Sequence, residues 1–277
     1  MSWKEIEAEG GVAVITGGAS GVGFAAAELL AAKGFSVLLA DKNADALAEA
    51  SQKISATGGQ VATAVTDVSD AEAVTALADQ AFTMGDVAIL MNNAGVGISS
   101  STWENPEAWR KTFDVNFFGI VNGVQAFVPR MIAAGRPACV INTGSKQGIT
   151  TPPGNPAYNA SKAAVKVLTE QLAHELREAN APIDAHLFVP GFTYTGMIAA
   201  HFSEKPDGAW TSAECVEYLF DNVADGVFYV LCPDNMVTEE VDAKRVLWSA
   251  QDIAQRRPAL SRWHPDWKDK FAAYENE

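Results

Sequence analysis

The sequence predicts an α/β fold built on one doubly wound sheet of seven parallel strands. Three observations predict it. Short apolar segments alternate with amphipathic helical segments, the first apolar segment ends in a glycine-rich loop, and a length of 277 residues suits one large domain. Short apolar strands separated by helices form parallel sheets that helices cover on both faces. We therefore expect a Rossmann domain with strand order 3-2-1-4-5-6-7 and a ligand site between the first and fourth strands.

The first half of the chain contains four expected strands. They are apolar runs of strand character at 12–16, 36–40, 60–66 and 87–92. Amphipathic patterns between them predict helices at about 22–33, 44–56 and 70–83, and a longer helix follows at about 106–134. Each strand is thus followed by a helix, as parallel pairing requires.

The second half continues the same alternation. Strands are expected at 138–142, 184–189 and 227–231, and helices at 156–179 and around 213–223. Asn155 and Pro156 are typical of an N-cap and a first helical residue, which places Tyr158 in the first turn of its helix.

We expect residues 1–277 to form a single domain with two additions. A lid segment is expected at 193–213, where Pro206-Asp207-Gly208 is a turn signal within a loop; the family resemblance described below implies that this segment covers the substrate. A C-terminal helical extension is expected at 233–277, where apolar residues between 237 and 256 recur at helical spacing. The segment 262–267 either caps the active site or covers a partner subunit.

Composition excludes several functions and compartments. A net charge of −14 and a pI near 4.7 argue against nucleic acid and anionic membranes as partners. No apolar run approaches 18 residues, and the first residues lack the layout of a signal peptide, so we expect a cytoplasmic protein. Three dispersed cysteines predict no disulfide framework, and the four histidines show no metal-ligand spacing, so no metal site is expected.

Tyr158 and Lys162 form a candidate acid–base pair. Their i, i+4 spacing places the phenol and the ammonium on one face of the helix. A neighbouring cation and the helix N-terminus both favour the phenolate, so we expect them to lower the tyrosine pKa toward neutrality. Ser145 directly follows the fifth expected strand, and its position ahead of the tyrosine indicates an ordered site.

Gly17, Gly21 and Gly23 indicate a dinucleotide site. They lie between the first strand and its helix, where glycines let the backbone approach a pyrophosphate beside free N–H groups. Asp41 ends the second strand at a spacing suited to binding an adenosine ribose. Its carboxylate would repel a 2′-phosphate, so NAD is preferred over NADP, and the neighbouring Lys42 is interpreted as a solvated surface lysine.

Together these motifs resemble the short-chain dehydrogenase/reductase family over residues 12 to about 231. The matching features include the glycine motif 16–23, Asp67-Val68, the loop 92–95 and the segment after the sixth strand. The resemblance implies a set of cofactor-binding residues, namely Gly17, Ser20, Gly21, Val22, Gly23, Asp41, Asp67, Val68, Asn93, Ala94, Gly95, Tyr158, Lys162, Pro190, Gly191, Thr193 and Thr195.

The resemblance also implies a catalytic set of Asn116, Ser145, Tyr158 and Lys162. Tyr158 would exchange a proton with the substrate oxygen, Ser145 would hydrogen-bond that oxygen, and Lys162 would lower the tyrosine pKa and bind the nicotinamide ribose. Asn116 would hold a water that links Lys162 to solvent. The implied activity is an NAD(P)-dependent alcohol dehydrogenase or ketone reductase that works as a homo-oligomer, a dimer or tetramer.

The lid composition predicts the substrate class. Met197, Ile198, Phe202 and Trp210 offer apolar surface, and residues 196–210 contain no arginine to bind a carboxylate or phosphate. We expect a bulky apolar or aromatic secondary alcohol, or its ketone. The alternative is that these side chains pack the lid against the sheet.

Three alternative functions would be accompanied by other sequence features. A non-catalytic NAD-binding redox sensor would not need the complete set of four catalytic residues. Sugar-nucleotide epimerases and dehydratases usually show a different glycine spacing and a larger substrate domain. A halohydrin dehalogenase-like protein would lack the glycine loop and carry arginine at the position of Lys162.

Overall fold

A computed structural model describes residues 3–196, 202 and 204–276 of the chain. Seven parallel strands form one sheet in the order β3-β2-β1-β4-β5-β6-β7, which confirms the predicted topology. The strands are β1 (Val12–Thr16), β2 (Ser36–Asp41), β3 (Val61–Val65), β4 (Val87–Asn92), β5 (Ala138–Thr143), β6 (Ile183–Val189) and β7 (Tyr229–Leu231).

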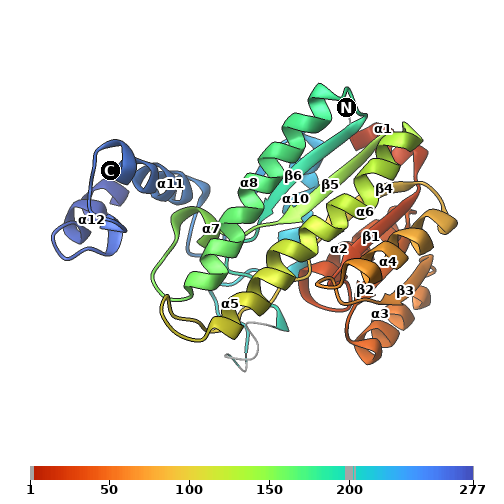
Figure 1. Ribbon diagram of the computed structural model, residues 1–277, viewed down its shortest axis with the longest axis horizontal. Coiled ribbons are helices and arrows are strands. Elements are labelled where there is room, and N and C mark those ends of the chain that lie inside the picture. Colours follow the sequence, from red (N-terminus) through yellow and green to blue (C-terminus); the bar gives the residue numbers. More distant parts are fainter. Residues whose placement is uncertain (1–2, 197–201, 203, 277) are drawn as a thin grey trace.

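Helices cover both faces of this sheet (Figure 1). One layer contains α1 (Trp3–Glu9), α2 (Gly21–Ala32), α3 (Ala44–Ala56) and α10 (Ser212–Ala224). The other contains α4 (Ala71–Met84), α6 (Gly119–Ala134) and α8 (Pro156–Glu178). The expected helices and strands are all present, and their ends differ from the expected ones by a few residues.

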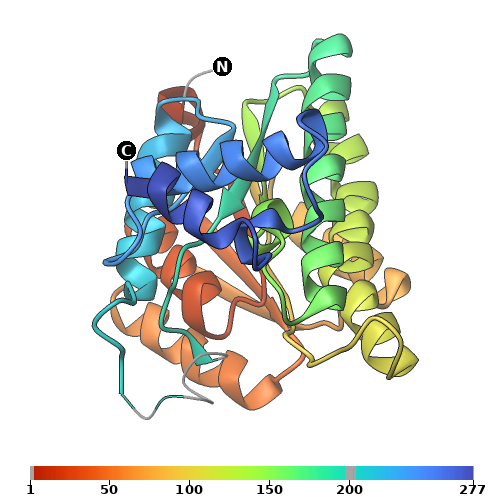
Figure 2. The same ribbon diagram turned by 90° about the vertical axis from the view of Figure 1, so that its left-hand side faces the viewer.

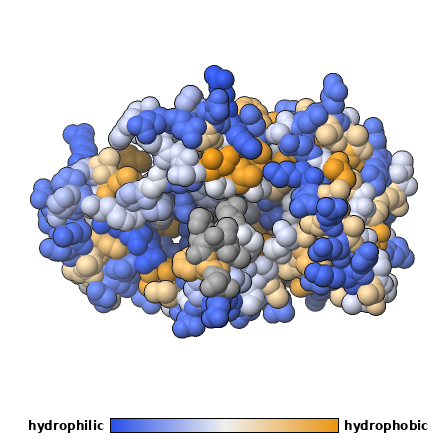
Figure 3. All heavy atoms as spheres, turned by 90° about the horizontal axis from the view of Figure 1, so that it is seen from below, coloured by the Kyte–Doolittle hydropathy of each residue, from blue (hydrophilic) through white to orange (hydrophobic). Residues whose placement is uncertain are grey.

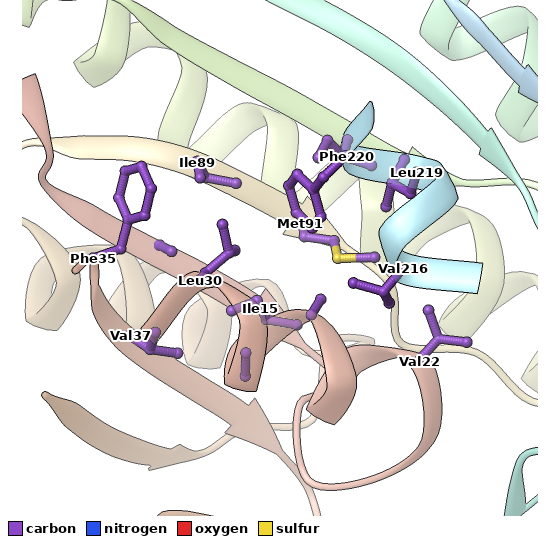
Figure 4. Close-up of a cluster of buried hydrophobic side chains, with 14 of the residues drawn as sticks. Ile15, Val22, Leu30, Phe35, Val37, Ile89, Met91, Val216, Leu219 and Phe220 are labelled. Carbon is purple, nitrogen blue, oxygen red and sulfur yellow. The ribbon is translucent and has the colours of Figure 1, made fainter. Parts of the chain in front are cut away.

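Two hydrophobic cores lie between the sheet and its two helix layers. Successive strand residues point to opposite faces, so Ile15 packs toward α2 and α10 whereas Val14 packs toward α4 and α6. Figure 4 shows the first core, in which Leu30 of α2 and Phe220 of α10 meet strand side chains. Both faces of the central strands are therefore buried, which explains their continuous apolar sequence.

The long helix expected over 106–134 contains a π-helical turn. It is composed of α5 (Pro106–Phe113), the π segment η1 (Asp114–Phe118) and α6, in immediate succession. By length and composition alone, Pro106–Ala134 is also the one helix in the described part of the chain that could cross a membrane. In the structure this helix packs against α4, β4 and α8. The π turn carries Asn116, which is buried.

The start of α8 differs from the expectation in its capping. Asn155 is the N-cap residue, but its side chain makes no capping hydrogen bond to the helix. Ser100, from the loop after β4, replaces it: its Oγ accepts from Ala157 N at 3.1 Å and donates to Asn155 Oδ1 at 2.7 Å. The loop after β4 is thereby attached to the helix that carries Tyr158.

A four-residue helix, α7 (Gln147–Thr150), was not expected from the sequence. It follows Ser145 and lies against α8. A Cβ added at Gly148 would lie 2.5 Å from the main-chain carbon of Lys162, so only glycine permits this approach. The backbone beside Ser145 and the helix of Lys162 are therefore in direct contact.

The C-terminal extension forms α11 (Glu239–Ala254), the short 3₁₀ turn η2 (Ser261–Trp263) and α12 (Lys268–Asn276). Trp248 of α11 is its central side chain and packs against the rings of Trp267, Phe271 and Tyr274. Figures 1 and 2 show that the extension lies beyond α7 at one end of the molecule. It is attached there through contacts between α11 and α7.

Figure 3 shows one face of the molecule, on which hydrophobic patches are interspersed with hydrophilic residues. Large apolar side chains that are exposed in the described part of the chain include Trp103, Phe118, Val167 and Ile253. All three cysteines, Cys139, Cys215 and Cys232, are free and buried.

Candidate active site

Hydrogen bonds of Asn93 join the ends of three neighbouring strands. Its main-chain N donates to Thr16 Oγ1 at 2.9 Å, and its Nδ2 donates to Thr16 O at 3.1 Å. Its Oδ1 accepts from Thr143 Oγ1 at 3.3 Å. Thr16, Asn93 and Thr143 follow or end β1, β4 and β5, so one side chain sets the relative positions of the loops after these strands.

The glycine loop passes close to this junction. Gly17 and Gly21 have φ angles of +63° and +56°, which side-chain-bearing residues rarely adopt. A Cβ at Gly23 would overlap Gly17 O and would lie 2.7 Å from Asn93 Nδ2. Ser20 is the N-cap of α2 but makes no side-chain capping bond, so it does not occupy the N–H groups of the first turn. The loop therefore presents backbone donors to an anion.

Asp41 lies beside this loop. Its Oδ2 accepts from Ala19 N at 3.4 Å and its Oδ1 accepts from Asn43 N at 3.0 Å. A cleft of about 310 Å³ extends from here, lined by Gly17, Ser20, Asp41, Lys42, Thr66, Asp67, Val68, Ser69, Ala94, Gly95, Val96, Lys111, Asp114 and Val115. Many of the residues expected to bind a cofactor thus share one cleft, and Lys42 also borders it.

Asn116 is fully buried and binds the main chain of Val96. Its Oδ1 accepts from Val96 N at 2.7 Å and its Nδ2 donates to Val96 O at 3.0 Å. Nδ2 also lies 3.3 Å from Ser161 Oγ. These bonds attach the loop after β4 to the π turn and to α8. The expected water between Asn116 and Lys162 stays a prediction.

Ser145, Tyr158 and Lys162 meet beyond the end of β5. Lys162 is 3% exposed, and its Nζ donates to Thr143 O at 2.7 Å and lies 5.9 Å from the centre of the Tyr158 ring. The side chain of Ser145 lies close enough to the phenol of Tyr158 to favour its ionised form. A serine hydroxyl, a phenol and an ammonium in one place can bind an oxygen atom and exchange a proton with it.

Burial governs the proton affinity of both titratable groups. It raises the pKa of Tyr158 above 10, and the nearby side chain of Ser145 opposes this only in part. Burial lowers the pKa of Lys162 to about 8. The expectation that Lys162 and the helix N-terminus bring the pKa of Tyr158 toward neutrality is thus wrong for the free protein, because the ammonium points to Thr143 O and desolvation dominates.

Comparison with known proteins identifies the family. The sequence pattern of the family described as short chain dehydrogenase matches residues 11–206. The chain belongs to the short-chain dehydrogenases. It is therefore an oxidoreductase that transfers a hydride between a nicotinamide cofactor and an alcohol or ketone.

Individual relatives of this short-chain dehydrogenase agree with that assignment. A 1-deoxy-11-beta-hydroxypentalenate dehydrogenase of Streptomyces exfoliatus is 37% identical, covering 91% of this chain and 93% of the relative. A short-chain dehydrogenase/reductase from Burkholderia phymatum, solved in complex with NAD, is 34% identical with a TM-score of 0.82, covering 90% of this chain and 95% of that one. An NADPH-bound short-chain oxidoreductase from Pseudomonas aeruginosa is 27% identical with a TM-score of 0.69, covering 77% and 89%.

The structure describes two of the four expected substrate residues, Phe202 and Trp210. Met197 and Ile198 lie outside the described residues. Phe202 is 48% exposed and packs edge-on against Phe192, with ring centres 6.4 Å apart. Trp210 packs against Tyr218 of α10 and the first hydrophobic core. Trp210 thus attaches the segment after β6 to the body of the enzyme, as the alternative expects, and its contact with substrate stays a prediction.

The segment after β6 is held beside the glycine loop. A Cβ at Gly21 would lie 3.4 Å from the side chain of Thr195. Thr193 pairs with Trp210 in an isolated β-bridge, and its Oγ1 bonds Gly191 O at 3.2 Å. Thr195 thus lies near the glycine loop, and Thr193 is held within the segment after β6.

A second cleft, of about 620 Å³, borders the first turn of α8. Its lining is mostly apolar and comprises Ser100, Ser101, Thr102, Trp103, Trp109, Thr151, Pro152, Pro153, Gly154, Pro156, Asn159, Ala160 and Leu260. Sequence reasoning missed this cleft, because its residues come from three distant parts of the chain, 100–109, 151–160 and Leu260, that carry no common motif. It also gave no role to the side chains of Thr16, Thr143 and Lys146, because their roles arise from contacts with residues far away in the chain.

The depressed pKa of Lys162 makes stability dependent on pH. Below pH 8 the buried ammonium is charged in both the folded and the unfolded state, and its full desolvation cost destabilises the folded state. This cost disappears as the pH rises from about 8 to 10.5, the pKa of the lysine in the unfolded chain. We expect Lys162→Met to have a larger free energy of unfolding than the wild type. The gain in free energy of unfolding should be about 2–3 kcal/mol larger at pH 7 than at pH 10.

Urea unfolding at the two pH values measures this difference. Lys166→Met is the matched control, since it removes an ion-paired lysine from the more exposed side of the same helix and sets the baseline. If the change in free energy of unfolding caused by Lys162→Met varied with pH no more than that caused by Lys166→Met, the ammonium would not be desolvated.

Proposed function

We propose that this short-chain dehydrogenase is an NAD-dependent alcohol dehydrogenase or ketone reductase acting on bulky apolar or aromatic secondary alcohols and their ketones. The observation that carries the proposal is the meeting of Ser145, Tyr158 and Lys162 at the end of β5. This point adjoins the loop after β4, since a Cβ at Gly95 would lie 3.7 Å from Lys162 Nζ. Acid–base groups and cofactor cleft therefore share one edge of the sheet.

The residues present fit a dinucleotide. The glycines leave no side chain between the loop and a pyrophosphate, and α2 directs its free N–H groups there. Asp41 would accept hydrogen bonds from the adenosine ribose, with Asp67, Val68 and the loop of Asn93 beside it. When bound, the nicotinamide supplies the hydride acceptor or donor.

Tyr158 would act as the general acid and base. Because burial keeps its phenol protonated at neutral pH, Oη holds the proton that reduction delivers to the carbonyl oxygen. In oxidation the same Oη must accept the hydroxyl proton, and the resulting phenolate needs a nearby cation and donor. Lys162 and Ser145 are placed to supply them.

Ser145 and Lys162 would have separate further roles. The Ser145 hydroxyl would hold the substrate oxygen beside the phenol, which reduces the loss of entropy at the reacting centre. Lys162, held by Thr143 O at the end of β5, would direct its remaining N–H groups toward a ribose. Because its pKa is about 8, this cation is present at pH 7 and lost in mildly alkaline solution.

Replacing the phenol tests this assignment. Tyr158→Phe should lower kcat by at least 10²-fold, since proton transfer by a positioned group contributes about 10²–10⁴-fold, and should leave the Kd for NADH nearly unchanged. Steady-state kinetics and a fluorescence titration measure the two quantities. Tyr229→Phe, which changes a surface tyrosine bonded to Glu170, is the control and should retain activity. Retention of a tenth of wild-type kcat by Tyr158→Phe would contradict the role.

Cofactor choice depends on Asp41. Its carboxylate accepts ribose hydrogen bonds and repels a 2′-phosphate, whereas the lysines of the cleft, Lys42 and Lys111, attract phosphate. Relatives bind either cofactor, so the acid at the end of β2 is the feature that favours NAD.

We expect NADH to bind more tightly than NADPH, and Asp41→Ala to reduce that preference by about tenfold, which corresponds to ~1.4 kcal/mol. Fluorescence titrations with both cofactors measure it. Asp45→Ala removes an exposed acid from the neighbouring first turn of α3 and is the control for net charge. Equal affinities in the wild type would contradict the assignment of Asp41.

Two features support an apolar substrate. The lid sequence 196–210 contains no arginine, and the mostly apolar second cleft borders the helical turn that carries Tyr158. Phe202, which is half exposed, offers further apolar surface from the lid.

An aryl secondary alcohol should have a larger kcat/KM than a short hydroxy acid, by about 1–3 kcal/mol or more in transition-state free energy, because an apolar pocket favours the extra ring. Phe202→Ala should reduce this preference. Steady-state kinetics with both substrates measure it, and a preference of the wild type for the acid would refute the apolar pocket.

We further propose that residues 1–277 act as one domain, with 193–213 as a lid over the substrate and 233–277 as a helical extension. A cytoplasmic homo-oligomer, dimer or tetramer, is the assembly we favour. The exposed Phe118 and Val167, on η1 and α8, support an additional protein contact there.

A further inference from the structure

Lys146 lies between the proposed catalytic serine and the C-terminal extension. It directly follows Ser145 and precedes α7, and its Nζ lies 2.6 Å from Asp242 Oδ2 and 3.5 Å from Asp234 Oδ2. The side chains of Asp242 and Asp234 are 6% and 5% exposed, and that of Lys146 is 20% exposed. The lysine therefore attracts both carboxylates in a largely dehydrated environment and offsets the repulsion between them.

The two carboxylates come from different elements. Asp242 is in the first turn of α11, the first helix of the extension. Asp234 lies in the turn after β7, where its Oδ1 accepts from Met236 N and Val237 N. Its Oδ2 accepts from Phe192 N, in the loop after β6. One lysine thus links the loops after β5, β6 and β7 to the extension.

The local structure around Ser145 depends on support from outside. Ser145 Oγ accepts from Gln147 N at 3.2 Å, and Ser145 O accepts from Gly148 N at 2.9 Å, so the first turn of α7 sets the direction of the hydroxyl. A helix of four residues is not stable by itself. Within the described residues, α7 is held by α8 on one side and by α11 on the other.

We propose that Lys146 is a positioning residue for Ser145, and that the ion pair with Asp242 makes the C-terminal extension a working part of the active site. This rests on the role of Ser145 proposed above. Without the ion pair, α7 loses its attachment to α11, and the serine hydroxyl moves away from the substrate oxygen. The extension thereby contributes to turnover without contacting the substrate.

An epistasis experiment distinguishes positioning from general stabilisation. Lys146→Met is introduced into the wild type and into the Ser145→Ala background, and kcat and KM are measured for an aryl secondary alcohol. We expect Lys146→Met to lower kcat about tenfold or more in the wild type and less than twofold in the Ser145→Ala background. The Kd for NADH should change less than twofold in both.

Two further variants keep the experiment interpretable if Lys146→Met folds poorly. Asp242→Asn preserves shape and leaves Lys146 near Asp234, so it should lower kcat in the same direction by a smaller factor. Lys146→Arg keeps the charge and should recover most of the wild-type kcat.

Lys244→Met is the matched control. Its lysine has nearly the same side-chain exposure, 21%, and pairs with Glu240 within α11, without reaching the loop of Ser145. It should leave kcat unchanged in both backgrounds.

If Lys146→Met or Asp242→Asn lowered kcat by the same factor in the wild type and in the Ser145→Ala background, the positioning role would be overturned and the proposed function would remain intact. Full activity of both variants in the wild type would do the same. If Ser145→Ala alone left turnover unchanged, the proposed role of Ser145 would fail, and the positioning role with it.

Discussion

The hydrogen bonds of Asn93 are the interaction on which the site depends most. This residue joins the ends of β1, β4 and β5 through Thr16 and Thr143. Gly23 must lack a side chain because a Cβ there would lie 2.2 Å from Gly17 O and 2.7 Å from Asn93 Nδ2. The sheet order makes these strands neighbours, so the glycine loop and the acid–base groups have a common reference. The cofactor cleft and the reactive groups are consequently fixed relative to each other.

Burial is the second constraint, and it acts on the proton chemistry. The main-chain oxygen of Thr143 accepts a hydrogen bond from Lys162 Nζ, and its hydroxyl donates one to Asn93 Oδ1. The same residue therefore holds both the strand ends and the catalytic lysine. Desolvation raises the pKa of Tyr158 above its ordinary value and lowers the pKa of Lys162 to about 8, so the lysine loses its proton at a lower pH than the tyrosine does. The enzyme therefore places a neutral phenol beside an ammonium group that loses its proton in mildly alkaline solution.

The C-terminal extension contacts the active-site side of the Rossmann domain. Its aromatic cluster around Trp248 gives it a core of its own, and the Lys146–Asp242 ion pair joins that core to the loop of Ser145. The second cleft includes Leu260 from the same extension. Residues far apart in the chain thus border the proposed substrate region together.

The sequence by itself determined the seven strands and their order, the glycine loop, and the grouping of Ser145, Tyr158 and Lys162. These follow from local patterns: apolar periodicity, glycine where the backbone turns, and i, i+4 spacing on one helix. Only the tertiary structure decided that Ser100 caps α8, that Trp210 packs on the core, and that Lys146 pairs with Asp242. It also decided the direction of the Tyr158 pKa shift. Each of these depends on which distant groups share a buried space, and no local spacing encodes the resulting desolvation.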